Sequence, residues 1–318
     1  MKRTLVFITG IIFSFQAFSQ GNAGIDINTL NHYKQLNDKE LRLIEFSDND
    51  EALILKLSQL EVINASRNRY KAPPVSLDIL ASRVANKQCR EAAENKYLSH
   101  WNLAGEKPYM RYAFAGGFDH VSENAFGGWT GGIYDKGPET IASMMEQGHN
   151  GFMSERAPND GHKQNIIEKS HNYVGLGYYI TDKEFRYYEE FIDRYVKFIS
   201  VPGELKVNER STLTVDTEGN SFLYFITIYY EDFPKPMKQT QLTKTGSYPD
   251  FTPEIYKNIP AWDLASYCRG TTYSIPLSFT KKGLYYIHIF TDPADKSKSR
   301  SLNTKGKTPV SGIVIKVR

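Results

Sequence analysis

Histidines are unevenly placed along the 318-residue chain, and their clustering is its clearest chemical signal. Five of the seven histidines fall between His100 and His171, and the same stretch supplies the carboxylates of Glu123, Glu146 and Glu155. Imidazole and carboxylate together suit a borderline metal ion such as zinc. The alternative is that each histidine is a surface or hydrogen-bonding residue of a glycine-rich stretch, so spacing alone leaves the metal site open.

The signatures of common hydrolases and nucleotide-binding proteins are missing. His-Glu-x-x-His is absent, and His120-Val-Ser-Glu123 is followed by Asn124, where the inverted form of that zinc signature needs a second histidine. There is no Gly-x-Ser-x-Gly, phosphate loop or dinucleotide fingerprint, and neither cysteine lies in a catalytic signature. We therefore expect no organic cofactor. The near balance of 39 basic and 36 acidic residues also argues against a nucleic-acid partner.

Residues 1–19 have the parts of a secretory signal peptide. Basic Lys2 and Arg3 precede an apolar run over 5–13, and small residues follow, which predicts cleavage near Ser19-Gln20. The apolar run is too short to span a membrane, and no cysteine follows it that could carry a lipid anchor. We expect a soluble mature protein, secreted or periplasmic, without a transmembrane segment.

The elements that would position these residues divide the rest of the chain into an arm and about two domains. Residues 20–49 are polar and form an N-terminal arm. A helix capped by Asp48 or Asp50 should follow, because leucine and isoleucine recur at helical spacing up to Ile63. A second helix is marked by apolar residues from Leu77 to Cys89, and a short one fits 139–147.

Residues 174–180 and 185–192 read as a hairpin that closes a first domain, 50–200. Helical periodicity then disappears, and the region 201–318 has short strands rich in β-branched and aromatic residues, expected at 212–215, 222–230, 273–277, 284–290 and 313–317. This pattern predicts a small β-sandwich domain of the immunoglobulin-like type.

The first domain contains five short sequence motifs that, taken in order, resemble those of a known family. They are Asn64-Ala-Ser-Arg67; Ser99-His100 with Gly105, Pro108 and Arg111; Ser122-Glu123-Asn124; Gly161-His162-Lys-Gln-Asn165-Ile166; and Val174-Gly-Leu-Gly177. In this order they resemble the bacterial branch of the CAP superfamily, the cysteine-rich secretory, antigen 5 and pathogenesis-related proteins. The resemblance implies an α-β-α sandwich, so the fold class expected for the whole chain is α+β, with the β-domain appended.

The family's cleft is lined by two histidines and two acidic residues, which bind zinc or another divalent ion in some members. By motif, the resemblance assigns His100, Glu123 and His162 to this set. The second acid is Glu146, with Glu155 as the alternative, because the chain is longer than usual before Gly161-His162. Ser122 departs from the glycine of the family pattern. Lying near these motifs, His120 and His149 are either supporting residues or, more simply, loop histidines.

Two further features have alternative interpretations. The two cysteines, Cys89 and Cys268, either form one long-range disulfide in an oxidising compartment or are unpaired, with Cys89 on the apolar side of its helix. A set of aromatic residues either lines an apolar groove for a lipid or peptide or fills the core of an irregular segment: Tyr109, Tyr112, Phe114, Phe118, Phe126 and Trp129.

The sequence thus predicts a secreted, non-catalytic binding module whose partner is an extracellular protein, a glycan, cell-wall material or a lipid. One alternative is a metal-dependent hydrolase, in which zinc on His100 and His162 would acidify water and Glu123 or Glu146 would accept a proton. The other is a structural envelope or matrix protein with a vestigial cleft. The appended β-domain favours a binding role by analogy only.

Overall fold

The computed structural model describes residues 25–219, 221–244, 248, 254–299, 301–303 and 305–318. The predicted signal peptide lies outside them. Among the described residues, no helix is both long and apolar enough to cross a membrane.

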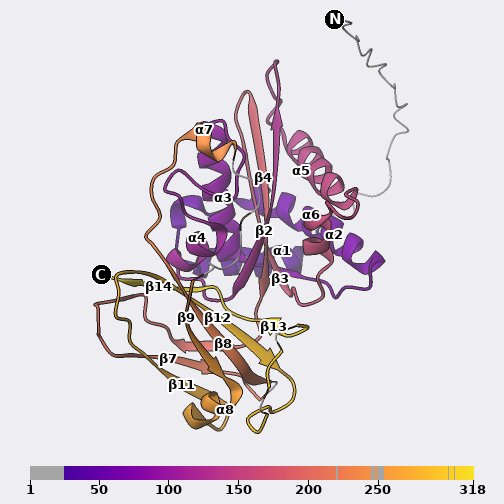
Figure 1. The fold of residues 1–318 in the computed structure, drawn as a ribbon. Coiled ribbons are helices and arrows are strands. Elements are labelled where there is room, and N and C mark those ends of the chain that lie inside the picture. The colour runs from indigo at the N-terminus through magenta and orange to yellow at the C-terminus, as the bar shows by residue number, and fades with distance from the viewer. Residues whose placement is uncertain (1–24, 220, 245–247, 249–253, 300, 304) are drawn as a thin grey trace, which may run out of the picture.

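The first domain is a three-layer sandwich, as predicted. Its sheet has the order β1-β3-β4-β2 and is antiparallel except for the short β1, which runs parallel to β3. Helices α3 and α4 lie on one face, and α2, α5 and α6 lie on the other (Figure 1). The bounds are α1 Ile27–Lys39, α2 Asp50–Arg69, β1 Ser76–Leu77, α3 Ile79–Glu94, α4 Pro108–Phe114, β2 His120–Trp129, α5 Pro138–Met153, α6 Gly161–Ile167, β3 Tyr173–Ile180 and β4 Glu184–Asp193, with a 3-10 turn at Ile44–Phe46.

The start of α2 differs from the prediction. Asn49, and neither Asp48 nor Asp50, caps the helix by accepting the Ala52 N–H at 2.8 Å. Asp48 instead pairs with Lys56 at 2.7 Å, where both side chains are buried. For Asp48, pairing with the buried lysine stabilises the fold more than capping the helix would, because an uncompensated charge in the interior is costly. The arm before it is also more ordered than its polar composition suggested, since it contains α1.

Glycines determine how closely α3 approaches the sheet. A Cβ built on Gly175 would lie 2.4 Å from the backbone of Ala81, and one built on Gly177 would lie 2.3 Å from that of Ala85. Helix α3 therefore packs against β3 with alanine facing glycine, which explains the glycines of the Val174-Gly-Leu-Gly177 motif. The Asn64-Ala-Ser-Arg67 motif is also structural, because Arg67 donates to the carbonyls of Ile166 and His171 at 2.6 and 2.9 Å.

The second domain is a β-sandwich with an apolar core between two sheets. The sheet orders are β10-β11-β7-β5 and β6-β14-β12-β8-β9, with β13 beside β12. The bounds are β5 Lys197–Ser200, β6 Glu204–Leu205, β7 Ser211–Asp216, β8 Phe222–Glu231, β9 Ile255–Pro260, β10 Cys268–Arg269, β11 Thr272–Leu277, β12 Gly283–Asp292, β13 Thr308–Pro309 and β14 Ile313–Val317, with helices α7 Gln239–Leu242 and α8 Ala261–Leu264 and a 3-10 turn at Ala265–Tyr267. Strand β5, which the sequence placed in the first domain, pairs with β7 of the sandwich.

The two domains share a buried apolar interface. Leu284 and Tyr286 of β12 and Val314 of β14 belong to the same hydrophobic cluster as residues of α3 and α4. Within it, the rings of Tyr109 and Tyr286 stack with centroids 4.5 Å apart. The sandwich is thus docked onto the α4 side of the first domain.

The aromatic stretch serves mainly as core. Tyr109 and Tyr112 are 1% exposed, and Phe114, Phe118 and Phe126 pack partly buried against apolar clusters, whereas Trp129 is exposed. The cysteines are unpaired, with Cys89 buried in the first domain and Cys268 partly exposed in the second. The disulfide is therefore not formed.

Candidate functional site

The edge strand β2 is the element on which the candidate site is built. Successive residues of a strand point to opposite faces of its sheet, so Glu123 faces α4 while Asn124 faces α6. The β2–β4 register places Glu123 beside Glu190 and Asn124 beside Glu189. The two halves of the predicted histidine and glutamate set therefore approach β2 from opposite sides of the sheet.

On the α4 side, Glu123 is held in a buried charge cluster. Its carboxylate contacts His100 Nδ1 at 2.8 Å and the guanidinium of Arg111, whose Nη2 lies 3.6 Å from Glu190 Oε1. Burial raises the pKa of Glu123, although Arg111 opposes the shift. Burial and the nearby Glu123 carboxylate raise the pKa of Glu190 well above its usual range. The two acids share one cation, which favours keeping a proton in the cluster.

On the α6 side, His162 pairs with Glu155. Glu155 Oε1 lies 2.5 Å from His162 Nδ1, and Glu155 Oε2 accepts the His162 backbone N–H at 3.1 Å. The imidazole stacks on Phe152, with ring centroids 4.8 Å apart. Unlike Glu123, both members are partly exposed, with 35% and 24% of their side chains accessible. This dyad can meet solvent or a ligand.

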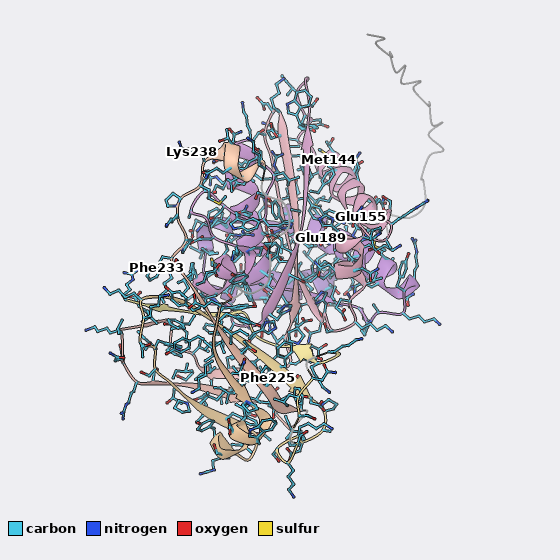
Figure 2. The ribbon with its side chains drawn as sticks, in the orientation of Figure 1. Met144, Glu155, Glu189, Phe225, Phe233 and Lys238 are labelled. Atoms are coloured by element: carbon cyan, nitrogen blue, oxygen red, sulfur yellow. The ribbon has the colours of Figure 1, made fainter. Side chains whose placement is uncertain are left out.

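Glu155, and not the favoured Glu146, is thus the acid beside His162. Helix α5 continues past Glu146 to Met153, and the chain turns back towards α6 only after that (Figure 2). Glu146 is left exposed on the helix surface. The sequence favoured it because the length of α5 was underestimated.

The predicted metal ligands do not fit a metal ion in this arrangement. Across the described ranges, no three or more histidine, cysteine, aspartate or glutamate side chains come together as a ligand group. The Glu123 carboxylate is fully buried and directed towards Arg111. A structural zinc site takes four ligands and a catalytic one three, whereas here His100 contacts the Glu123 carboxylate and His162 contacts that of Glu155.

The remaining histidines of the cluster are buried, His120 in β2, His149 in α5 and His171 just before β3. His149 of α5 bonds with Glu189 Oε1 at 3.0 Å and Ser66 Oγ at 2.9 Å. His120 and His171 flank Asp193, each at 2.8 Å. Burial opposes ionisation of Asp193, but its hydrogen bonds to the two imidazoles prevail and lower its pKa. The simpler expectation, that His120 and His149 are loop residues, is wrong, because both are part of polar networks inside the fold.

Sequence reasoning missed two residues at the site, Glu190 and Tyr248. The Tyr248 hydroxyl accepts the Glu123 backbone N–H at 3.0 Å, although Tyr248 belongs to the second domain in sequence. A signal for Glu190 was present, because the two adjacent acids Glu189 and Glu190 lie between aromatic residues of the strand, after Tyr188 and before Phe191. Charged residues are rarely fully buried unless they are paired.

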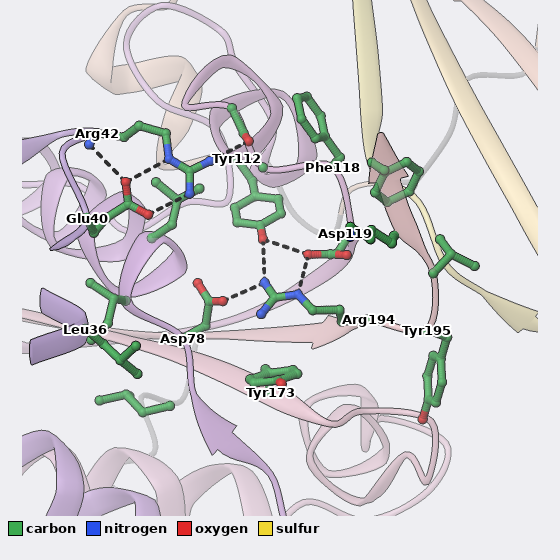
Figure 3. A pocket seen from close by; sticks show the side chains of 18 of the residues that line it. Leu36, Glu40, Arg42, Asp78, Tyr112, Phe118, Asp119, Tyr173, Arg194 and Tyr195 are labelled. Atoms are coloured by element: carbon green, nitrogen blue, oxygen red, sulfur yellow. Dashed lines mark hydrogen bonds and ion pairs between the residues drawn. The ribbon is translucent and has the colours of Figure 1, made fainter. Parts of the chain in front are cut away.

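A separate pocket of about 990 Å³ lies between the arm, α4 and the chain that leads into the sandwich. In Figure 3, Arg194 extends between Asp78 and Asp119, which it contacts at 2.7 and 2.9 Å, over the ring of Tyr173. Burial raises the pKa of Asp119 despite Arg194. The lining includes none of the predicted metal ligands, and its acidic and basic side chains are balanced. We therefore interpret this pocket as a polar contact region between the arm, the first domain and the segment that leads into the sandwich.

Comparison with known proteins places the first domain in a family. The family described as CAP, the cysteine-rich secretory protein family, matches residues 60–191. No curated protein matches the sequence.

Several solved structures are similar over part of the chain. An extracellular SCP-domain protein from Bacillus anthracis is 20% identical over 43% of this chain and 40% of its own, with a TM-score of 0.33. An outer surface protein from Borrelia burgdorferi is 18% identical over 44% of this chain and 92% of its own, with a TM-score of 0.36. The similarity thus spans about two fifths of the Bacillus protein. With the family match and the three-layer fold, residues 60–191 of this chain are a CAP domain of the cysteine-rich secretory protein family.

Proposed function

We propose that the chain is an extracellular, non-catalytic binding module in which the ligand contacts the β2 edge of the CAP domain together with the partly exposed His162–Glu155 pair beside it. The observation that carries this proposal is the state of Glu123, whose carboxylate is fully buried and engaged by Arg111 and His100. A general base must reach the proton it abstracts. Glu123 is instead held within the fold, where its carboxylate orients His100.

An extracellular location is supported by two independent features. The sequence begins with the three parts of a signal peptide, and the family to which the CAP domain belongs is described as secretory. Cell-wall material is the first ligand to test, because it is the polymer a secreted bacterial protein meets.

The binding assay uses cosedimentation of the mature protein with purified peptidoglycan. The site variant is His162→Ala with Glu155→Gln, since this dyad is partly exposed and its loss leaves the buried cluster intact. The matched control is His32→Ala, an exposed histidine on α1. We expect wild type and control to sediment with the polymer and the site variant to remain in solution. Equal sedimentation of all three would contradict the use of this site.

A second candidate, a hydrolase, is favoured by one observation. An imidazole oriented by a carboxylate is the usual arrangement of a general base, and the His162–Glu155 pair has this geometry with partial exposure. Release of soluble fragments from peptides or peptidoglycan, lost in His162→Ala with an unchanged circular dichroism spectrum, would establish it. Binding without fragment release supports the non-catalytic proposal.

Divalent-metal binding remains a prediction from the resemblance. Calorimetric titration of zinc into wild type and His100→Ala/His162→Ala tests it directly. Stoichiometric binding lost in the double variant would mean that the carboxylates rearrange to admit the ion. A flat titration of wild type would agree with the paired arrangement described above.

A further inference from the structure

A segment of the β-sandwich lies across the CAP domain. After β8 the chain leaves the sandwich, follows the edge of the first domain past Phe233 and Lys238, and forms α7 beside α3 (Figures 1 and 2). We refer to residues 233–244 as the strap. Helix α7, drawn in orange, stands among elements drawn in purple, so residues far apart in sequence are neighbours here (Figure 1).

The strap is bound by specific contacts. Met237 donates its backbone N–H to the Leu103 carbonyl at 2.8 Å, and Gln239 Nε2 donates to the Lys96 carbonyl at 2.9 Å. Leu242 is fully buried in a cluster with Tyr97 of the CAP domain.

The CAP surface is also shaped for the strap at Gly105. This residue has a φ of +78°, and a Cβ there would lie 2.2 Å from the Lys235 carbonyl oxygen. The close approach and the positive φ both require glycine at this position. A larger residue would displace the strap.

Beyond the strap, Tyr248 reaches the candidate site. Its hydroxyl accepts the Glu123 N–H, and its ring centroid lies 4.7 Å from that of His100 and 6.2 Å from that of Trp101. The angle to Trp101 is 88°, an edge-to-face arrangement. These separations are in the range of favourable aromatic pairs. We call the space bounded by His100, Trp101 and the Glu123 N–H the aromatic niche.

The niche is suited to a phenolic ring for two reasons. Strand β2 is the edge of its sheet, so the Glu123 N–H faces away from β4 and needs an acceptor from outside the sheet. His100 is held by Glu123 through Nδ1, so its ring is fixed against the incoming group. Together they offer one hydrogen-bond donor and two aromatic surfaces.

We propose that the aromatic niche is a subsite for the side chain of a tyrosine of an extracellular polypeptide, and that Tyr248 fills it in cis. The external tyrosine competes with Tyr248 for the same hydrogen bond and the same ring contacts. This inference rests on the proposed binding function and names a second group, a tyrosine side chain, that the His100 side of the β2 edge recognises. The strap keeps Tyr248 at high local concentration, so only a ligand with further contacts displaces it.

The first experiment measures whether Tyr248 occupies the niche. Diethyl pyrocarbonate modifies accessible histidines, and mass spectrometry gives the rate at each one. We expect Tyr248→Ala to accelerate modification of His100 severalfold, with exposed His32 as the unchanged internal reference. Tyr248→Phe keeps the ring but loses the hydrogen bond. The equilibrium constant for occupancy of the niche should therefore fall about fivefold, because one hydrogen bond contributes about 1 kcal/mol.

The second experiment tests the ligand chemistry with p-cresol, the tyrosine side chain as a free molecule, and with toluene, which lacks the hydroxyl. In Tyr248→Ala, p-cresol should protect His100 from modification and toluene should not. Protection by both compounds alike, or by neither, would overturn the phenolic specificity.

Equal His100 rates in wild type and in both Tyr248 variants would overturn the occupancy itself. Neither readout depends on peptidoglycan, so failure of the proposed function remains distinguishable from failure of this inference.

Discussion

Arg111 is the cation that faces the buried carboxyls of Glu123 and Glu190, and replacing it with methionine tests whether charge compensation holds this part of the fold together. Methionine keeps an unbranched side chain but removes the guanidinium. The side chains of Glu123 and Glu190 are 0% and 1% exposed, so neither carboxylate can turn towards water. Removing one partner from a buried ion cluster costs about 3–5 kcal/mol, and we expect a loss of this size near neutral pH.

The loss should depend on pH with a defined sign. Burial already raises the pKa of Glu123 and Glu190, and the absence of Arg111 raises both further. A carboxyl whose pKa is raised by folding binds protons more tightly in the folded state. The free energy of unfolding then falls as pH rises above the unfolded value of about 4.3. Arg111→Met should therefore lose more stability at about pH 8 than at about pH 5.

Urea unfolding followed by circular dichroism at both pH values measures these changes. The control is Arg90→Met, which breaks an exposed helical pair with Glu94 and should change the stability little, because solvent screens exposed ion pairs. Adding Glu123→Gln and Glu190→Gln to Arg111→Met should recover much of the loss, because the buried charges disappear. A loss below about 1 kcal/mol at both pH values would refute the charge-compensation reasoning.

Three further predictions concern packing and reactivity. Gly175→Ala should destabilise the CAP domain by about 1–3 kcal/mol in the same urea assay, because the new methyl group would overlap the backbone of α3; an unchanged midpoint would show that α3 can shift. Burial raises the pKa of the Cys89 thiol, so a thiol reagent should modify Cys268 in the native protein and Cys89 only after unfolding; two fast thiols would contradict this. Tyr286→Ala should cost about 3 kcal/mol, because it removes the ring stacked on Tyr109 at the domain interface; a loss under about 1 kcal/mol would mean that the domains are held elsewhere.

Much of the fold could be predicted from local patterns. The apolar spacing up to Ile63 indicated α2, and alternating β-branched and aromatic residues located the main strands, including β14 at 313–317 with its observed bounds. The ordered motifs identified the CAP domain that the family comparison confirms. The helix and strand predictions succeed because each kind of element places apolar residues at a short, regular spacing along its own sequence.

The irregular stretch before α5 was predicted poorly. Helix α4 and strand β2 lie in a glycine-rich segment whose periodicity is weak, and burial of large aromatic side chains such as Tyr109 and Tyr112 stabilises it instead. Propensity is a weak guide where tertiary packing decides.

By itself the sequence determined only part of this site, namely the residues that lie in recognisable motifs. The resemblance of their motifs pointed to His100, Glu123 and His162, and the unusually long chain before Gly161-His162 kept Glu155 as the alternative to Glu146. The tertiary structure decided how those residues are used. Strand register placed Glu190 beside Glu123, and docking of the second domain brought Tyr248 to His100. Such contacts depend on the packing of elements distant in sequence, which no local period encodes.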